Sequence, residues 1–164
     1  MNDTLKSAYL RLLLRFGLIV LTGTVLFTQA FLLMRAAGNE MFPAVKDGDL
    51  LLAFRLQRDY AKNDVVVYSH AGEKAIGRIA ALGGDVVTLD DSGTLLVNGT
   101  EQSGEIMFPT YAKEELQYPY RVPENTVFLL GDRRSVAHDS REMGAVAMEE
   151  LKGKVITVLR RRGI

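Results

Sequence analysis

Three side-chain types that can form a nucleophilic relay occur together near the C-terminal end of the sequence. Ser135, His138 and Asp139 have the types of a nucleophile, a general base and a group that orients the base. Because all three fall within one turn of chain, relay geometry is hard to reach, and we expect His138 to be a surface or capping residue. His70 is expected in a turn between strands.

Glu40 is a further candidate for chemistry. A carboxylate attacks an amide poorly, because the tetrahedral adduct reverts by expelling the better leaving group. An acid–base mechanism would need a second carboxyl group nearby. Asp139 is expected to pair with an arginine instead. We therefore predict no catalytic role for Glu40.

The amino-acid composition argues against a metal site and against a nucleic-acid partner. The chain has no Cys and two His, so it offers neither disulfides nor the clustered ligands of a metal site. We predict no metal and no cofactor. The formal net charge is zero, which argues against a nucleic-acid partner.

An uncharged stretch near the N-terminus predicts a membrane anchor. Residues 16–34 carry no charge, and as a helix they would span roughly 28 Å, enough for a bilayer core. A cleaved signal peptide would have a shorter apolar core, and a buried helix would show a polar face. Basic residues lie mainly before the stretch, which predicts a cytoplasmic N-terminus and an extracellular C-terminal domain. The predicted division is residues 1–15 cytoplasmic, 16–35 transmembrane and 36–164 extracytoplasmic, in a single-pass protein of the cell membrane.

The outer part of the chain is predicted to be all-β. Short apolar runs separated by Gly and Asp predict strands at residues 50–54, 65–68, 75–82, 86–89, 95–97, 126–130 and 154–159. Asn98-Gly99 predicts a tight turn, and residues 148–151 a short helical turn. Many strands without a long amphipathic helix are typical of a β-barrel or sandwich-like domain.

Four segments of this domain resemble the motifs of type I signal peptidases. They are residues 38–49 (GNEMFPAVKDGD), 62–68 (KNDVVVY), 77–85 (GRIAALGGD) and 131–144 (GDRRSVAHDSREMG). They occur in the order of the family and follow a predicted anchor. The resemblance implies a signal-peptidase-like β-barrel domain behind one transmembrane helix.

The resemblance also implies which positions matter. The family uses a Ser nucleophile, a neutral Lys base and a second Ser that orients the Lys; these positions map to Glu40, Gly77 and Ala137. We therefore expect a pseudoenzyme without catalytic residues. The nearby Lys74 has an odd offset from Gly77, so its side chain should point to the opposite face of the strand.

Two further sets of residues follow from the resemblance. A peptide cleft is expected near the three degenerate positions, with the charge of Glu40 inside it: Gly38, Asn39, Glu40, Met41, Ala75, Ile76 and Gly77. Structural positions, with ion pairs among them, are expected at Arg78, Asp85, Asp132, Arg134, Asp139 and Arg141.

Three functions remain open. The first is a chaperone that binds an exported protein, as in the pilus assembly proteins of Gram-positive bacteria that resemble signal peptidases and act with a class C sortase. The second is an active signal peptidase with a displaced dyad. The third is a decoy or regulator that binds an active signal peptidase. Expected partners are the membrane, a pilin or other exported protein, and a sortase or active signal peptidase.

Overall fold

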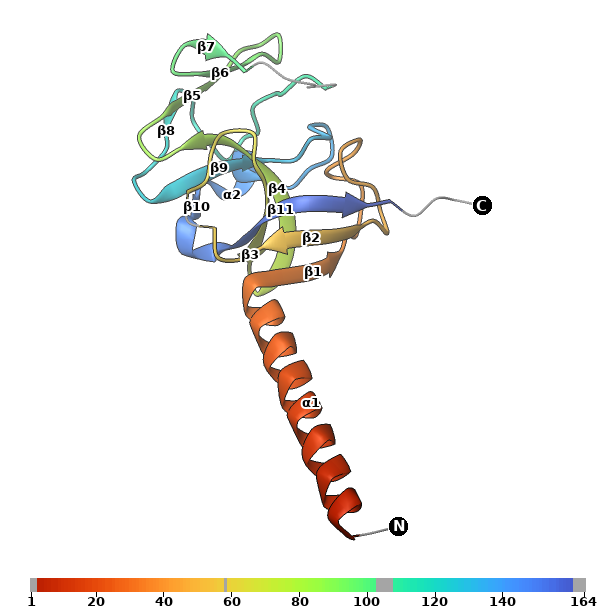
Figure 1. Ribbon diagram of the computed structural model, residues 1–164. Helices are drawn as coiled ribbons and strands as arrows, with labels where there is room; N and C mark the ends of the chain where they lie inside the picture. Colours follow the sequence, from red (N-terminus) through yellow and green to blue (C-terminus); the bar gives the residue numbers. More distant parts are fainter. Residues whose placement is uncertain (1–2, 58, 103–107, 161–164) are drawn as a thin grey trace.

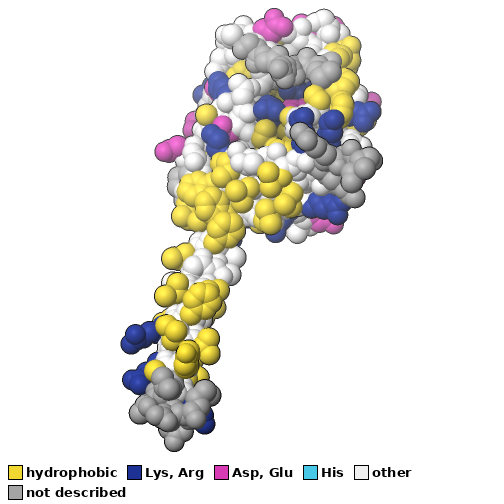
Figure 2. Space-filling model, turned by 45° about the vertical axis from the view of Figure 1, so that its right-hand side comes forward, with side chains coloured by type: hydrophobic (Ala, Val, Ile, Leu, Met, Phe, Trp, Pro, Cys, Tyr) yellow, Lys and Arg dark blue, Asp and Glu magenta, His cyan; other side chains and the backbone are white. Residues whose placement is uncertain are grey.

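The computed structural model describes residues 3–57, 59–102 and 108–160. A long helix, α1 (Asp3–Ala30), extends away from a β-rich domain (Figure 1). Over Lys6–Ala30 it is long and apolar enough to cross a membrane, a test that an N-terminal signal sequence also passes. Its side chains from residue 6 to 29 are exposed, and Figure 2 shows that hydrophobic side chains along it continue onto the adjoining end of the domain.

The helix ends earlier than predicted. Residues 31–35 were expected to complete the transmembrane helix, but they form strand β1 (Phe31–Arg35), which pairs with β2 (Leu50–Phe54). Arg55 terminates the helix: its backbone N–H donates to the carbonyl of Ala30 at 2.8 Å. Its guanidinium donates to the carbonyl of Thr28 at 3.0 Å, placing a positive charge at the C-terminal end of the helix dipole.

Two sheets make up the domain, in agreement with the predicted all-β class. The larger has the order β1-β2-β11-β3-β4-β9-β10, and the smaller the order β7-β6-β5-β8. Their remaining strands are β3 (Val65–His70), β4 (Glu73–Leu82), β5 (Val86–Leu89), β6 (Leu95–Val97), β7 (Thr100–Glu101), β8 (Tyr120–Arg121), β9 (Thr126–Leu130), β10 (Val146–Ala147) and β11 (Leu151–Leu159). The short helices are α2 (Ser140–Met143) and η1 (Met148–Glu150).

Burial alternates along the strands, and the buried apolar side chains gather in several clusters. In β2, Leu51 and Ala53 are fully buried while their neighbours are half-buried, as expected for a strand with one covered face. Val87 of the smaller sheet packs in one cluster with Phe128 and Leu130 of β9, a strand of the larger sheet. This cluster connects the two sheets. At the predicted tight turn, Asn98 and Gly99 both have positive φ, at 54° and 78°, as a two-residue hairpin turn requires.

Strand β4 is paired unequally along its two edges. One edge pairs with β3 along residues 73–78. The other pairs with β9 only from Arg78 to Leu82. Within the described residues, no strand therefore pairs with the second edge of residues 73–77, and this free edge faces the candidate site.

Candidate functional site

The loop that carries Glu40 is held in place by backbone bonds at its base. The Ala36 N–H donates to the Asp49 carbonyl at 2.8 Å, and the Gly48 N–H donates back to the Ala36 carbonyl at 2.9 Å. The buried Asp49 carboxylate also accepts from the Lys46 N–H at 2.9 Å. Gly48 has a φ of 83°, which favours glycine. The base of the loop is thus fixed, and residues 38–45 project from it.

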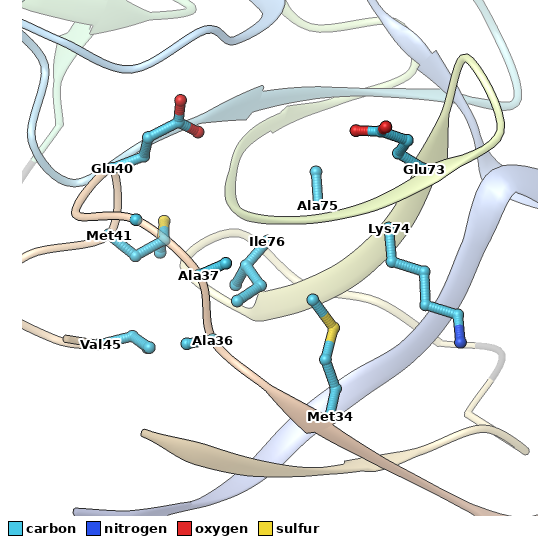
Figure 3. A pocket seen from close by; sticks show the side chains of 11 residues that line it. Met34, Ala36, Ala37, Glu40, Met41, Val45, Glu73, Lys74, Ala75 and Ile76 are labelled. Carbon is cyan, nitrogen blue, oxygen red and sulfur yellow. The ribbon is translucent and has the colours of Figure 1, made fainter. Parts of the chain in front are cut away.

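A pocket of about 250 Å³ lies between this loop and the free end of β4 (Figure 3). Its lining comprises Met34, Ala36, Ala37, Gly38, Glu40, Met41, Val45, Glu73, Lys74, Ala75 and Ile76. Of the predicted cleft residues, Gly38, Glu40, Met41, Ala75 and Ile76 are in this set, whereas Asn39 and Gly77 are not. The floor is apolar, and the titratable side chains of the lining are Glu40, Glu73 and Lys74.

Glu40 lines the pocket, and its backbone holds the neighbouring loop. The Glu40 carbonyl accepts from the Arg133 N–H at 2.8 Å. Gly131 lies beneath this contact, because a Cβ there would come within 2.9 Å of the Glu40 carbonyl oxygen and 2.3 Å of the Cβ of Ala137. Glu40 and the fully buried Ala137 therefore meet at Gly131.

Gly77 lies beneath two large side chains. A Cβ at Gly77 would be 3.3 Å from the Cβ of Leu129 and 3.3 Å from the Cε1 of Tyr68. Tyr68 is buried, and burial together with the charges of Glu40 and Asp139 raises its pKa to about 12. The phenol is therefore neutral at physiological pH, and this ring occupies the space beside position 77.

Lys74 behaves as its strand position predicts. Figure 3 shows its amine pointing away from the carboxylates of Glu40 and Glu73. The register of β3 and β4 places Ser69 directly opposite Lys74. Because directly opposed residues share a face, their Cβ atoms lie about 5 Å apart. The hairpin thus brings one hydroxyl and one amine together on the face away from Glu40.

The predicted structural residues form two ion pairs. Arg78 donates to both carboxylate oxygens of Asp132, at 2.7 and 2.6 Å. Arg141 donates to Asp139 at 2.8 and 2.9 Å, and both side chains are buried. The backbone connects the two pairs, because Gly131, whose N–H donates to Asp139, directly precedes Asp132.

The other two predicted structural residues also lie in hydrogen-bonded turns. The Asp85 carboxylate accepts from the Leu82 N–H at 2.8 Å and pairs with Lys62 at 3.0 Å. Arg134 is buried and donates to the hydroxyl of Thr110 at 2.5 Å. Burial lowers the pKa of Arg134 to about 10.

The Ser135–His138–Asp139 relay does not form. Asp139 caps α2, accepting from the Arg141 N–H, and Ser135 is exposed. The His138 side chain is 80% exposed, and its Nδ1 lies 2.8 Å from the Glu142 carboxylate. This hydrogen bond raises the pKa of His138 above its usual value. His70, the last residue of β3, is also exposed.

No group of three His, Asp or Glu that could hold a metal ion occurs within residues 3–57, 59–102 and 108–160.

Two groups near the site were missed by the sequence reasoning. Glu73 lines the pocket. It lies two residues before Ala75 and four before Gly77, so the three residues share one face of a strand. This spacing is a sequence signal that could have placed Glu73 near the cleft. Lys113 donates to the Ala137 carbonyl at 2.8 Å and pairs with Glu142. Nothing local in the sequence predicts that contact, because it joins residues 24 positions apart.

Comparison with known proteins decides the family. The family model described as "Signal peptidase, peptidase S26" matches residues 9–159. The chain belongs to this family. The signal peptidase I of Bacillus caldolyticus is 30% identical over 135 residues, covering 72% of this chain and 73% of that protein. Thylakoidal processing peptidase 1 of Arabidopsis thaliana is 26% identical and covers 82% of this chain, which spans 44% of that protein.

A solved structure supports the same family. The crystal structure of a signal peptidase I from Enterococcus faecalis matches with a TM-score of 0.51 at 26% identity, covering 61% of this chain and 98% of that one. This signal-peptidase-like chain therefore has the predicted fold: a mostly β domain behind one apolar helix.

The comparisons contradict the prediction that the chain is not an enzyme. The relatives are named as signal peptidases, which are enzymes. That prediction relied on the side-chain types at Glu40, Gly77 and Ala137 alone. Three positions assigned by motif alone do not outweigh the enzymatic names of these relatives. The narrower assignment to a pilus assembly subgroup remains a prediction, as these relatives are named for peptidase activity.

Proposed function

We propose that this chain is a membrane-anchored endopeptidase of the signal peptidase I type that cleaves exported proteins. Family membership and the enzymatic names of its relatives support this proposal. It corresponds to the second of the three functions left open by the sequence.

One structural observation carries the proposal. The pocket is bordered on one side by residues 36–41 and on the other by residues 73–76 of β4, where no strand of the described part of the chain pairs with the second edge. An unpaired edge offers backbone N–H and C=O groups to an extended peptide, which can bind as an added strand. The pocket beside the edge then takes alternate side chains of that peptide. At about 250 Å³ the pocket is smaller than the roughly 300–1,000 Å³ of typical ligand sites, and its lining is largely apolar, so short apolar side chains fit there.

Catalysis in this chain requires a hydroxyl and a base away from the family's usual positions. Ser69 and Lys74 are one pair to test, because the β3–β4 register places them opposite each other. Ser69 lies on β3, at the edge of β4 opposite the groove, so cleavage by this pair requires the peptide to reach across β4. In such a dyad the neutral amine takes the proton of the hydroxyl as its oxygen adds to the peptide carbonyl. The amine then gives this proton to the leaving nitrogen as the C–N bond breaks, and water hydrolyses the resulting ester. The pair lies on the face of the hairpin away from Glu40, so the tests must also include the Glu40 side.

The decisive experiment is precursor cleavage by the purified full chain in detergent. An exported precursor is incubated with the wild type, Ser69→Ala, Lys74→Met and Glu40→Gln, and the products are located by mass spectrometry. Loss of cleavage in Ser69→Ala and Lys74→Met, with unchanged circular dichroism, assigns the dyad to that pair. Cleavage that survives both changes places the dyad elsewhere. Absence of cleavage by the wild type, across precursors that another signal peptidase does process, contradicts the proposed function.

The proposal includes the membrane orientation, with the N-terminus inside and the β domain outside. The chain has no Cys, so single cysteines can report the side of the membrane without background. Ser7→Cys should be shielded from a membrane-impermeant thiol reagent in intact cells, and Glu149→Cys should be labelled. Crosslinking in the same cells tests the proposed partners: a pilin or other exported protein, a sortase, or an active signal peptidase.

A further inference from the structure

Two carboxylates flank the same side of the pocket. Glu40 comes from the loop, and Glu73 is the first residue of β4. Figure 3 shows both carboxylates on one side of the pocket, with the methyl group of Ala75 between them and the Lys74 amine directed away. Residues 73 and 75 share this face of the strand because side chains alternate along it.

Neither carboxylate has a hydrogen bond or an ion pair within the described part of the chain. Glu40 does act on its surroundings, since its charge contributes to the raised pKa values of Tyr68 and His138. A peptide bound along β4 would remove water from both carboxylates. Burying a charge without a partner is costly, so a neutral or acidic peptide would be opposed at this point and a cationic side chain would be favoured.

We propose that Glu40 and Glu73 make the groove selective for an extended segment in which a Lys or Arg side chain lies among small residues. The backbone of the segment pairs with the free edge of residues 73–77, and its small side chains face Ala36, Ala75 and Ile76. The cationic side chain lies between the two carboxylates. The inference deepens the proposed function by naming its substrate class, and it rests on that function.

Binding of matched peptides to the full chain in detergent tests this selectivity. The probes are fluorescent peptides of alanine and serine that are identical except for one position, occupied by Lys, Gln or Glu and moved along the peptide. Fluorescence anisotropy gives each dissociation constant. At the favoured position, the Lys peptide should bind about fivefold more tightly than the Gln peptide, and the Glu peptide more weakly than both. The preference should shrink in high salt.

Charge-neutralising variants assign the preference to the two residues. Glu40→Gln and Glu73→Gln should each reduce it, and the double variant should abolish it while the Gln peptide still binds. Glu149→Gln is the matched control, because Glu149 is exposed on η1 and does not line the pocket. It removes the same charge and should leave the preference unchanged.

The outcomes separate the two proposals. If the Lys and Gln peptides bind equally at every position, the proposed selectivity is wrong but the peptide groove stands. The same conclusion follows if the preference for Lys survives in the double variant. If no peptide binds and no precursor is cleaved, the proposed function fails and the selectivity fails with it.

Discussion

The ion pair between Asp139 and Arg141 should be among the most sensitive points of the domain. The carboxylate and guanidinium meet at 2.8 Å, and the two side chains are 3% and 2% exposed. Arg141 also donates to the carbonyls of Arg134 and Tyr111, so it ties α2 to two other segments. Asp139→Asn keeps the size of the side chain but leaves the guanidinium buried without its counter-charge.

The expected loss can be estimated from this burial. Removing one partner of a buried ion pair costs about 3–5 kcal/mol in the free energy of unfolding. In a domain of this size, 1 kcal/mol shifts the Tm by about 2–4 °C, so the Tm of Asp139→Asn should fall by about 6–20 °C. Asn retains an oxygen that can accept from the Gly131 N–H, so the loss comes chiefly from the charge.

Thermal unfolding of the full chain in detergent, followed by near-ultraviolet circular dichroism, measures this loss. Five of the six tyrosines lie in the β domain and one, Tyr9, in α1, so this signal chiefly reports the β domain. Glu150→Gln is the control: its pair with Lys152 is long, at 3.4 Å, and the side chains are 45% and 36% exposed. That change should cost less than about 1 kcal/mol.

Two results would refute the reasoning. One is a melting temperature for Asp139→Asn that equals that of the Glu150→Gln control. The other is a double variant, Asp139→Asn with Arg141→Met, that is no more stable than Asp139→Asn alone. Removing the unpaired guanidinium should recover part of the loss.

Two other predictions use the same site. Gly131→Ala should destabilise the domain by about 2 kcal/mol or more, because its Cβ would overlap Ala137 and the Glu40 carbonyl; unchanged urea unfolding would contradict that packing. The imidazole of His138 should titrate above its usual pKa of about 6.5, as followed by NMR, and Glu142→Gln should lower that pKa. The pKa of His138 is higher in the folded than in the unfolded protein. The His138–Glu142 pair therefore stabilises the fold fully below about pH 6.5, and this stabilisation is lost as the pH rises through the folded pKa.

Much of the fold could be predicted because its signals are local. The runs at residues 50–54, 86–89, 95–97 and 126–130 match the observed strands β2, β5, β6 and β9. Their apolar residues lie between Gly, Asp and Asn, which terminate strands through turn geometry. The strands β1, β7, β8 and β10 were missed. Three of them have only two residues, and β1 continues an apolar helix without any break in composition.

The candidate site was harder to predict from the sequence than the fold. Glu40 could be placed in the cleft because a motif surrounds it, and Lys74 could be directed away by the alternation of a strand. Glu73 belongs to no motif, so its carboxylate was not expected beside Glu40. Its approach to Glu40 depends on where the loop lies relative to the start of β4, which is a contact between distant segments of the chain.

By itself, the sequence determined that an apolar segment precedes a β domain and that four motifs of one peptidase family follow in order. These properties are carried by neighbouring residues, whose types set hydropathy, alternation and turns. Only the tertiary structure decided that β4 keeps a free edge at residues 73–77 and that Glu40 and Glu73 flank one groove. Those features arise from strand pairing between distant segments, and side-chain types along the chain do not specify which edge remains unpaired or which charges face each other across it.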